Sequence, residues 1–163
     1  MHALHHNQPE MKIIRHLRDE QATRQLGIAL APLLQPELKV YFYGALGTGK
    51  TTLVRGILEG LGHRGKVKSP SYILVELYPL SRLDLYHFDF YRFEDAKEWQ
   101  DAGFREYFDT RSVCLVEWPE NAGDLLPAPD IKISLRIKGT GRDVTIEGTT
   151  ETGRQCLAGF QNG

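Results

Sequence analysis

Cysteine is scarce in this sequence: Cys114 and Cys156 are the only two among 163 residues. Two cysteines so far apart make neither a disulfide framework nor the close pairs of a zinc site. Cys114 also lies inside an apolar run, residues 113–116, where a thiol is expected to be buried in a strand. Disulfide-stapled secreted folds and cysteine-based metal sites are therefore excluded.

Long apolar runs and an excess of one charge are missing as well. No apolar segment approaches the roughly 18 residues that a membrane span needs, and residues 1–10 lack the apolar centre of a signal peptide. The 20 basic and 21 acidic residues leave a net charge of −1, which excludes strong nonspecific nucleic-acid binding by the whole surface but not by a local patch. We expect a cytoplasmic protein that does not associate with a membrane.

The overall composition, with 41% hydrophobic and 25% charged residues, is that of one ordinary globular domain. We expect a flexible leader over residues 1–10, a single folded domain over residues 11–150 and a tail over residues 151–163. The leader contains three histidines, for which a frayed terminus is a simpler interpretation than a metal site.

The most informative stretch is residues 38–61, which reads as a buried strand, a glycine-rich turn and a helix. The pattern GxxxxGK[ST] runs from Gly44 to Thr51, and backbone N–H groups in such a loop surround a polyphosphate. Gly44, Gly47 and Gly49 leave room for those N–H groups to face the ligand. A chance glycine turn is the alternative, but the strand before the loop and the helix after it are the context that the motif requires.

The residue types after the glycines predict a site for ATP and Mg²⁺. A helix beginning at about Lys50 directs its unpaired N–H groups and its positive end at the same phosphates. We expect Lys50 to reach the β- and γ-phosphates and the Thr51 hydroxyl to ligate Mg²⁺. Thr52 follows on the helix and is placed to donate to the α-phosphate.

Periodicity predicts the remaining elements. Residues 11–17 alternate weakly as a first strand, and a helix capped by Asp19 follows. Residues 72–78 and 83–90 predict two antiparallel strands joined by a short turn. Residues 94–102 are polar and helix-like, and the aromatic residues Phe104, Tyr107 and Phe108 are expected to dock the next segment on the core. Further strands are expected at 113–116, 131–137 and 144–147, the last two forming a hairpin around Gly139 to Gly141 with Arg142 at its tip.

Two acids at strand ends are candidates for the metal site. Glu117 follows a buried parallel strand, where P-loop enzymes keep a carboxylate for Mg²⁺, although it would also serve as a cap before Pro119. Asp89 ends the strand 83–90 and has two interpretations, a surface residue beside Arg92 or a carboxylate directed at the metal or its water. We favour the metal-site interpretation for both.

The basic, polar stretch 63–72 contains Ser69, Pro70 and Ser71 and is expected to be a loop. In a nucleotide-binding protein such a loop senses the γ-phosphate as a switch. A solvated connection explains the same residues equally well. Together these elements predict an α/β fold: a P-loop NTPase-like three-layer sandwich with a mixed, mainly parallel sheet and a C-terminal antiparallel hairpin.

Four blocks, GALGTGKTT, VKSPSYILVE, YHFDFYRF and LVEWPE, occur in this order, and together the chain resembles the bacterial TsaE (YjeE) family over residues 20–142. The resemblance implies a single P-loop ATPase domain for tRNA threonylcarbamoyladenosine biosynthesis. It also implies that TsaB and TsaD are the partners and that tRNA is met only through their complex. Thr48 stands where alanine is more usual.

The resemblance also assigns roles to residues. It implies that Lys50, Asp89 and Glu117 are catalytic and that Thr51 and Glu117 ligate the metal. The residues implied to bind the nucleotide are Glu20, Thr23, Gly44, Leu46, Gly47, Thr48, Gly49, Lys50, Thr51, Thr52, Trp118 and Arg142.

The expected function is therefore Mg²⁺-dependent ATP binding and hydrolysis, weak in the isolated chain and stimulated by partners. The GTPase strings DxxG and NKxD are absent from the sequence. A small-molecule P-loop kinase and a nucleotide-dependent binding module remain as alternatives.

Overall fold

The computed structural model describes residues 11–67, 74–95, 97, 99, 100 and 103–161. The strands are β1 (Met11–Leu17), β2 (Lys39–Tyr43), β3 (Val75–Pro79), β4 (Asp84–Asp89), β5 (Val113–Glu117), β6 (Ile131–Lys138) and β7 (Gly141–Gly148). The described α-helices are α2 (Glu20–Leu30), α3 (Lys50–Gly60), α5 (Phe104–Phe108) and α6 (Glu151–Gln161), with 3₁₀ turns at Ala31–Leu33, Pro119–Asn121 and Gly123–Leu125. The expected leader, residues 1–10, lies outside the described residues.

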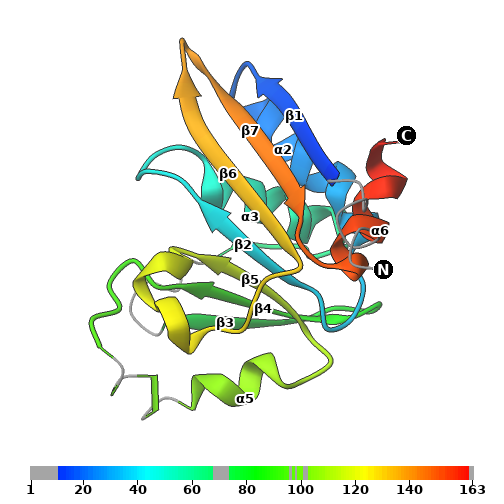
Figure 1. The fold of residues 1–163 in the computed structure, drawn as a ribbon. Helices are drawn as coiled ribbons and strands as arrows, with labels where there is room; N and C mark the ends of the chain where they lie inside the picture. Colours follow the sequence, from blue (N-terminus) through cyan, green and yellow to red (C-terminus); the bar gives the residue numbers. More distant parts are fainter. Residues whose placement is uncertain (1–10, 68–73, 96, 98, 101–102, 162–163) are drawn as a thin grey trace, which may run out of the picture.

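All of these strands form one sheet in the order β1-β7-β6-β2-β5-β4-β3 (Figure 1). The four central strands β6, β2, β5 and β4 pair in parallel. Both borders are antiparallel, through β1 and β7, β7 and β6, and β3 and β4. The mixed sheet and the C-terminal hairpin are confirmed. Parallel pairs are confined to the centre, however, and are three of the six strand pairs among the described residues rather than most of them.

Helices cover both faces of the sheet because successive side chains of the central strands alternate between two cores. In β5, Val113 and Leu115 belong to the core that also contains apolar residues of α2, α3 and α6. Cys114 and Val116 face the other core, where α5 packs. The expected three layers and the burial of Cys114 are confirmed.

The second core is mainly aromatic. Phe104 and Phe108 of α5 lie against Phe88 of β4, with ring centroids 6.0 and 4.7 Å away. The expected docking of this segment is therefore confirmed. The predicted helix at 94–102 falls partly on residues outside the described ranges.

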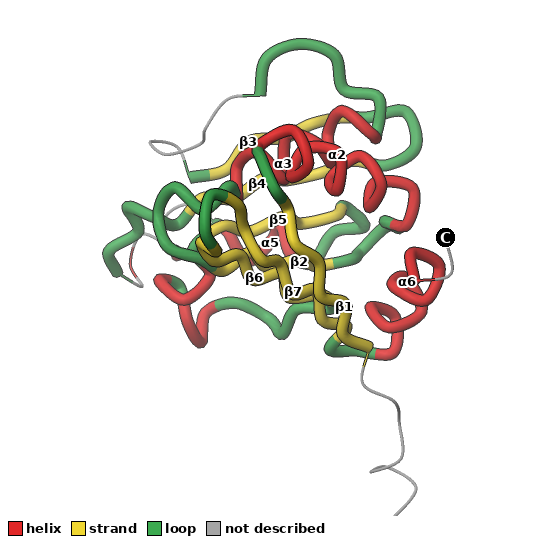
Figure 2. Tube along the Cα trace, turned by 90° about the horizontal axis from the view of Figure 1, so that it is seen from above, coloured by secondary structure: helices red, strands yellow, loops and turns green. Residues whose placement is uncertain are grey.

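The final segment corrects one expectation. Residues 151–161, set apart as a tail, form α6, and Cys156 and Leu157 bury their side chains in the main core. The Thr150 hydroxyl accepts a hydrogen bond from the Gly153 N–H, as an N-cap does. In Figures 1 and 2, α6 lies beside β1 and β7, and contacts with both strands join it to the domain.

Helices α2 and α3 pack in backbone contact, side by side in both views (Figures 1 and 2). A Cβ atom added at Gly56 would lie 2.2 Å from the Arg24 carbonyl oxygen, and one at Gly27 would lie 2.5 Å from that of Leu53. Only glycine permits this approach. The contact holds the start of α2 next to the glycine loop that precedes α3.

Among the described residues, no helix combines the length and the apolar character that crossing a bilayer requires.

Candidate functional site

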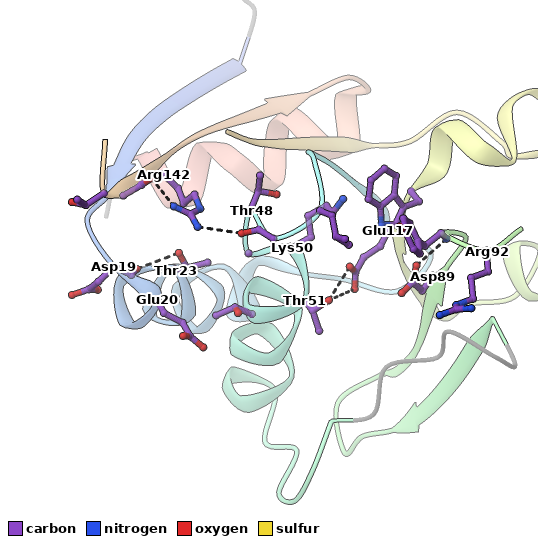
Figure 3. Close-up of a pocket in the computed structure, with 18 residues that line it drawn as sticks. Asp19, Glu20, Thr23, Thr48, Lys50, Thr51, Asp89, Arg92, Glu117 and Arg142 are labelled. Carbon is purple, nitrogen blue, oxygen red and sulfur yellow. Dashed lines mark hydrogen bonds between the residues drawn. The ribbon is translucent and has the colours of Figure 1, made fainter. Parts of the chain in front are cut away.

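One pocket of about 460 Å³ opens where the central parallel strands end. The loop between β2 and α3 forms its floor, and the ends of β4 and β5 form one wall (Figure 3). The start of α2 and the start of β7 form the opposite wall. Ligands of open α/β sheets bind at this position, outside the carboxyl ends of parallel strands.

The glycine loop needs its glycines for conformation and for space. Gly47 and Gly49 have φ values of 83° and 106°, which residues with a Cβ rarely adopt. Gly44 is constrained by space as well, because a Cβ there would lie 2.6 Å from the Leu135 carbonyl oxygen of β6. Thr48 is buried, and its hydroxyl donates to the Ala45 carbonyl at 2.8 Å, so its side chain braces the loop.

Lys50, the first residue of α3, is only 4% exposed. Its ammonium donates to the Gly44 carbonyl and lies 3.4 Å from the centre of the Trp118 ring. Burial lowers the pKa of Lys50, while the nearby carboxylates of Glu117, Glu120 and Asp89 act in the opposite direction. The Lys50 ammonium thus lies beside the loop, in contact with a backbone carbonyl and an aromatic face.

Glu117 is the last residue of β5 and is almost fully buried. The Thr51 hydroxyl lies 2.9 and 3.1 Å from its two carboxylate oxygens (Figure 3). His87 Nε2 lies 2.6 Å from one of them, Oε2. A hydroxyl and a carboxylate, here close to the start of α3, are oxygen donors that a hard cation prefers.

Asp89 lies in the pocket wall and is not a surface residue, being 7% exposed. Burial raises the pKa of its carboxyl group, against the effect of the hydrogen bond that Oδ1 accepts from the Tyr91 N–H at 3.0 Å. Arg92 lines the same pocket. The surface interpretation of Asp89 is therefore wrong, and its role at a metal or its water stays a prediction.

The opposite wall is formed by residues from both ends of the chain. Thr23 of α2 is buried, and its methyl group lies 3.6 Å from where a Cβ of Gly49 would be. Arg142 of β7 donates from Nη2 to the Gly47 carbonyl at 3.1 Å and from Nη1 to the Gly141 carbonyl at 2.9 Å. Figure 3 shows this guanidinium reaching across to the loop. The hairpin tip is therefore hydrogen-bonded to the glycine loop.

The structure brings nearly all sequence-predicted site residues to this pocket. The ones that line it are Glu20, Thr23, Leu46, Gly47, Thr48, Gly49, Lys50, Thr51, Thr52, Asp89, Glu117, Trp118 and Arg142. Gly44 does not line the pocket, and its backbone lies close to that of Leu135 in β6.

Sequence reasoning did not assign the pocket residues Asp19, Tyr91, Arg92, Thr140 and Gly141. Tyr91 and Arg92 belong to the YHFDFYRF block, and Asp19 was noted only as a helix cap. The contact between His87 and Glu117 was also missed, although alternation along the predicted strand 83–90 puts His87 on the same face as Asp89.

The predicted switch loop is only partly visible, because residues 68–73 lie outside the described ranges. Arg64 and Lys66, which precede them, line a separate hollow with Arg24 and Arg55. The switch stays a prediction.

Comparisons with known proteins agree on one protein family. The family model described as threonylcarbamoyl adenosine biosynthesis protein TsaE matches residues 17–144. The chain is similar to the tRNA threonylcarbamoyladenosine biosynthesis protein TsaE of Haemophilus influenzae, with 38% identity over 155 residues, covering 92% of this chain and 98% of the relative. The protein of the same name from Treponema pallidum is 36% identical over 130 residues, covering 79% and 96%.

A solved structure gives the same picture of the fold. The crystal structure of Bacillus subtilis YdiB matches with a TM-score of 0.81 and 25% identity, covering 96% of this chain and 98% of that one.

Proposed function

This chain belongs to the family of threonylcarbamoyl adenosine biosynthesis protein TsaE, and from that premise we propose that it binds ATP with Mg²⁺ in the pocket and hydrolyses it. The hydrolysis serves the threonylcarbamoyladenosine modification of tRNA in the cytoplasm. The chain acts with partners of the TsaB and TsaD kind and meets tRNA through their complex.

The observation that carries the proposal is the meeting of Thr51 and Glu117 beside the glycine loop. The Thr51 hydroxyl lies within hydrogen-bond distance of both carboxylate oxygens of Glu117. Because the first residues of α3 are aimed at the pocket, a nucleotide there presents its β- and γ-phosphates to the same two side chains. A pocket of about 460 Å³ is also of the size that holds a nucleotide.

The residues fit a Mg²⁺ ion that has few protein ligands and completes its coordination with water and phosphate oxygens. Among the described residues, no group of three histidine, cysteine or acidic side chains is arranged to hold a metal. Mg²⁺ usually keeps several waters and is bound by one or two protein oxygens plus substrate phosphates. Thr51 and Glu117 would hold it, and when bound it neutralises charge that develops on the phosphate oxygens.

The other side chains bind the nucleotide and prepare the transfer to water. The glycine-loop N–H groups and the start of α3 hold the phosphates, and Lys50 leaves the Gly44 carbonyl and the Trp118 ring to contact them. Asp89 lies in the wall next to Glu117 in the paired strands and orients the attacking water. Arg142, fastened to the loop, closes the pocket over the nucleotide.

Hydrolysis by the isolated chain is expected to be slow. Charge on the transferred phosphoryl group usually requires a further cation, often an arginine from another chain. The Arg142 guanidinium is already committed to two backbone carbonyls. A partner that supplies a cation, or that moves Arg142 or Arg92, would raise the rate.

The test is ATP hydrolysis by the purified chain, first alone and then with TsaB-like and TsaD-like proteins. We expect slow release of phosphate alone and a clear increase with both partners. Transfer of phosphate to an added small acceptor would point to a kinase instead. Partner binding that requires ATP and is unchanged when hydrolysis is abolished would point to a binding module.

A further inference from the structure

The side chain of His87 is enclosed in the protein next to the candidate metal site, yet it does not line the pocket. Its exposure is 0%, and that of the Glu117 side chain is 3%. Nε2 of His87 lies 2.6 Å from Oε2 of Glu117. The imidazole therefore cannot touch a nucleotide, and its evident contact with the site is through that carboxylate.

The register of two parallel strands creates this contact. Asp89 pairs with Glu117, and His87 pairs with Leu115, two residues further back along both strands. Side chains two residues apart lie on the same sheet face. The His87 ring thus stands behind the carboxylate of Glu117, on the side away from solvent.

The second ring nitrogen identifies the donor. Among the described residues, the buried Nδ1 of His87 has no hydrogen-bond partner. A proton on Nδ1 would be a buried N–H without an acceptor, which costs more than a bare ring nitrogen. Nε2 therefore carries the ring proton, and this N–H donates a hydrogen bond to Glu117.

Lys50 is the competitor for the same carboxylate. Glu117 is the nearby acid with the largest electrostatic effect on the pKa of Lys50. In the part of the chain that the structure describes, however, Lys50 forms no ion pair with any acid. Glu117 is instead held by Thr51 on one side and by His87 on the other.

We propose that His87 is the positioning residue of Glu117: its Nε2–H holds the carboxylate against Thr51 and away from Lys50, in the orientation that a divalent cation needs. Without that hydrogen bond, Glu117 turns to Lys50, and the pair neutralises both the metal ligand and the phosphate-binding cation. The inference rests on the proposed function, because it concerns the metal that accompanies ATP.

The experiment compares His87→Asn with His87→Gln. The glutamine amide nitrogen reaches the place of Nε2, whereas the asparagine amide is too short to reach Glu117. ATP affinity is measured by titration calorimetry with Mg²⁺ and again with EDTA. The dissociation constant in EDTA divided by that in Mg²⁺ reports the metal-dependent part of binding.

We expect His87→Asn to lower that ratio by about 10-fold or more, the range found when hydrogen bonds that orient metal ligands are removed. His87→Gln should keep the ratio close to that of the unaltered protein. In a Glu117→Gln background the asparagine substitution should have no further effect on the ratio, since both changes act through one carboxylate.

Thermal unfolding checks that each variant is folded. If His87→Asn does not fold, His87→Met, which fills the space without a donor, takes its place. An equal loss of affinity in Mg²⁺ and in EDTA, a glutamine variant as impaired as the asparagine variant, or effects that add to those of Glu117→Gln would each overturn the proposal. If the unaltered protein binds ATP no better with Mg²⁺, the proposed function itself fails, and that result is distinct from a failure of the His87 variants alone.

Discussion

Gly56→Ala is expected to destabilise the protein, although alanine is the better helix former. Inside a helix, glycine to alanine normally contributes about 1 kcal/mol of stability. At Gly56, however, the new Cβ would lie 2.2 Å from the Arg24 carbonyl oxygen and 3.0 Å from its carbonyl carbon. These are backbone atoms of α2, so no side chain can turn aside, and α2 must move away by about 1 Å to reach normal contact.

The expected net effect follows from these two opposing contributions. Overpacking costs about 1–3 kcal/mol and occasionally more, and the backbone contact places Gly56 at the upper end. With the helix preference subtracted, the loss is about 2 kcal/mol, or a melting temperature lower by about 4–8 °C. ATP affinity should fall as well, because α2 carries Thr23 against the glycine loop.

Gly159→Ala in α6 is the matched control. The nearest atom to a Cβ there is the flexible tip of Leu33, at 3.2 Å, so the helix preference should prevail and stability should stay equal or rise. Thermal unfolding and calorimetric ATP titration of both variants check this. If Gly56→Ala melts at or above the temperature of the unaltered protein, backbone contact between α2 and α3 does not determine the position of Thr23.

Three further substitutions test the site. Lys50→Ala should remove most ATP affinity, because Lys50 is the cation that the loop itself carries to the phosphates; unchanged affinity in a calorimeter would refute its role. Glu117→Gln should leave the fold intact and weaken Mg²⁺-dependent hydrolysis, since the amide loses the charge that holds the cation; a normal hydrolysis rate would return Glu117 to a structural role. Asp89→Asn should raise the melting temperature at pH 7 more than at pH 4. Burial raises the pKa of Asp89, so the folded state favours the protonated acid, and stability is lost as pH rises from the unfolded to the folded pKa. Asparagine removes that loss. An equal shift in melting temperature at both pH values would contradict this explanation.

The parts of the site that depend on local sequence could be predicted. The order of strand, glycine turn and helix around Lys50 lies within one short segment, and the φ values of Gly47 and Gly49 follow the motif. Glu117 could be placed because a buried parallel strand ends at a predictable sheet edge.

The parts that depend on distant pairing could not be predicted. The contact of His87 with Glu117 arises from the register of β4 against β5, which no local pattern encodes. Trp118 adopts a φ of 57° immediately after β5, and only the assembled loop shows that its ring meets Lys50.

Helix α6 shows a different limit of sequence reasoning. Two glycines, Gly153 and Gly159, lower its helix propensity and hide its period. Gly153 is present because a Cβ there would lie 1.9 Å from the Asp130 carbonyl oxygen. The requirement comes from the tertiary contact, and it overrides the local preference.

The most direct test of the central claim is the threonylcarbamoyladenosine content of tRNA in cells whose own TsaE has been depleted. The tRNA is digested and quantified by mass spectrometry after expression of this chain or of its Lys50→Ala variant, at matched protein levels. The account predicts that the unaltered chain restores the modified nucleoside and that the variant does not. Equal restoration by both would show that nucleotide binding in this pocket is not what the chain contributes to the modification.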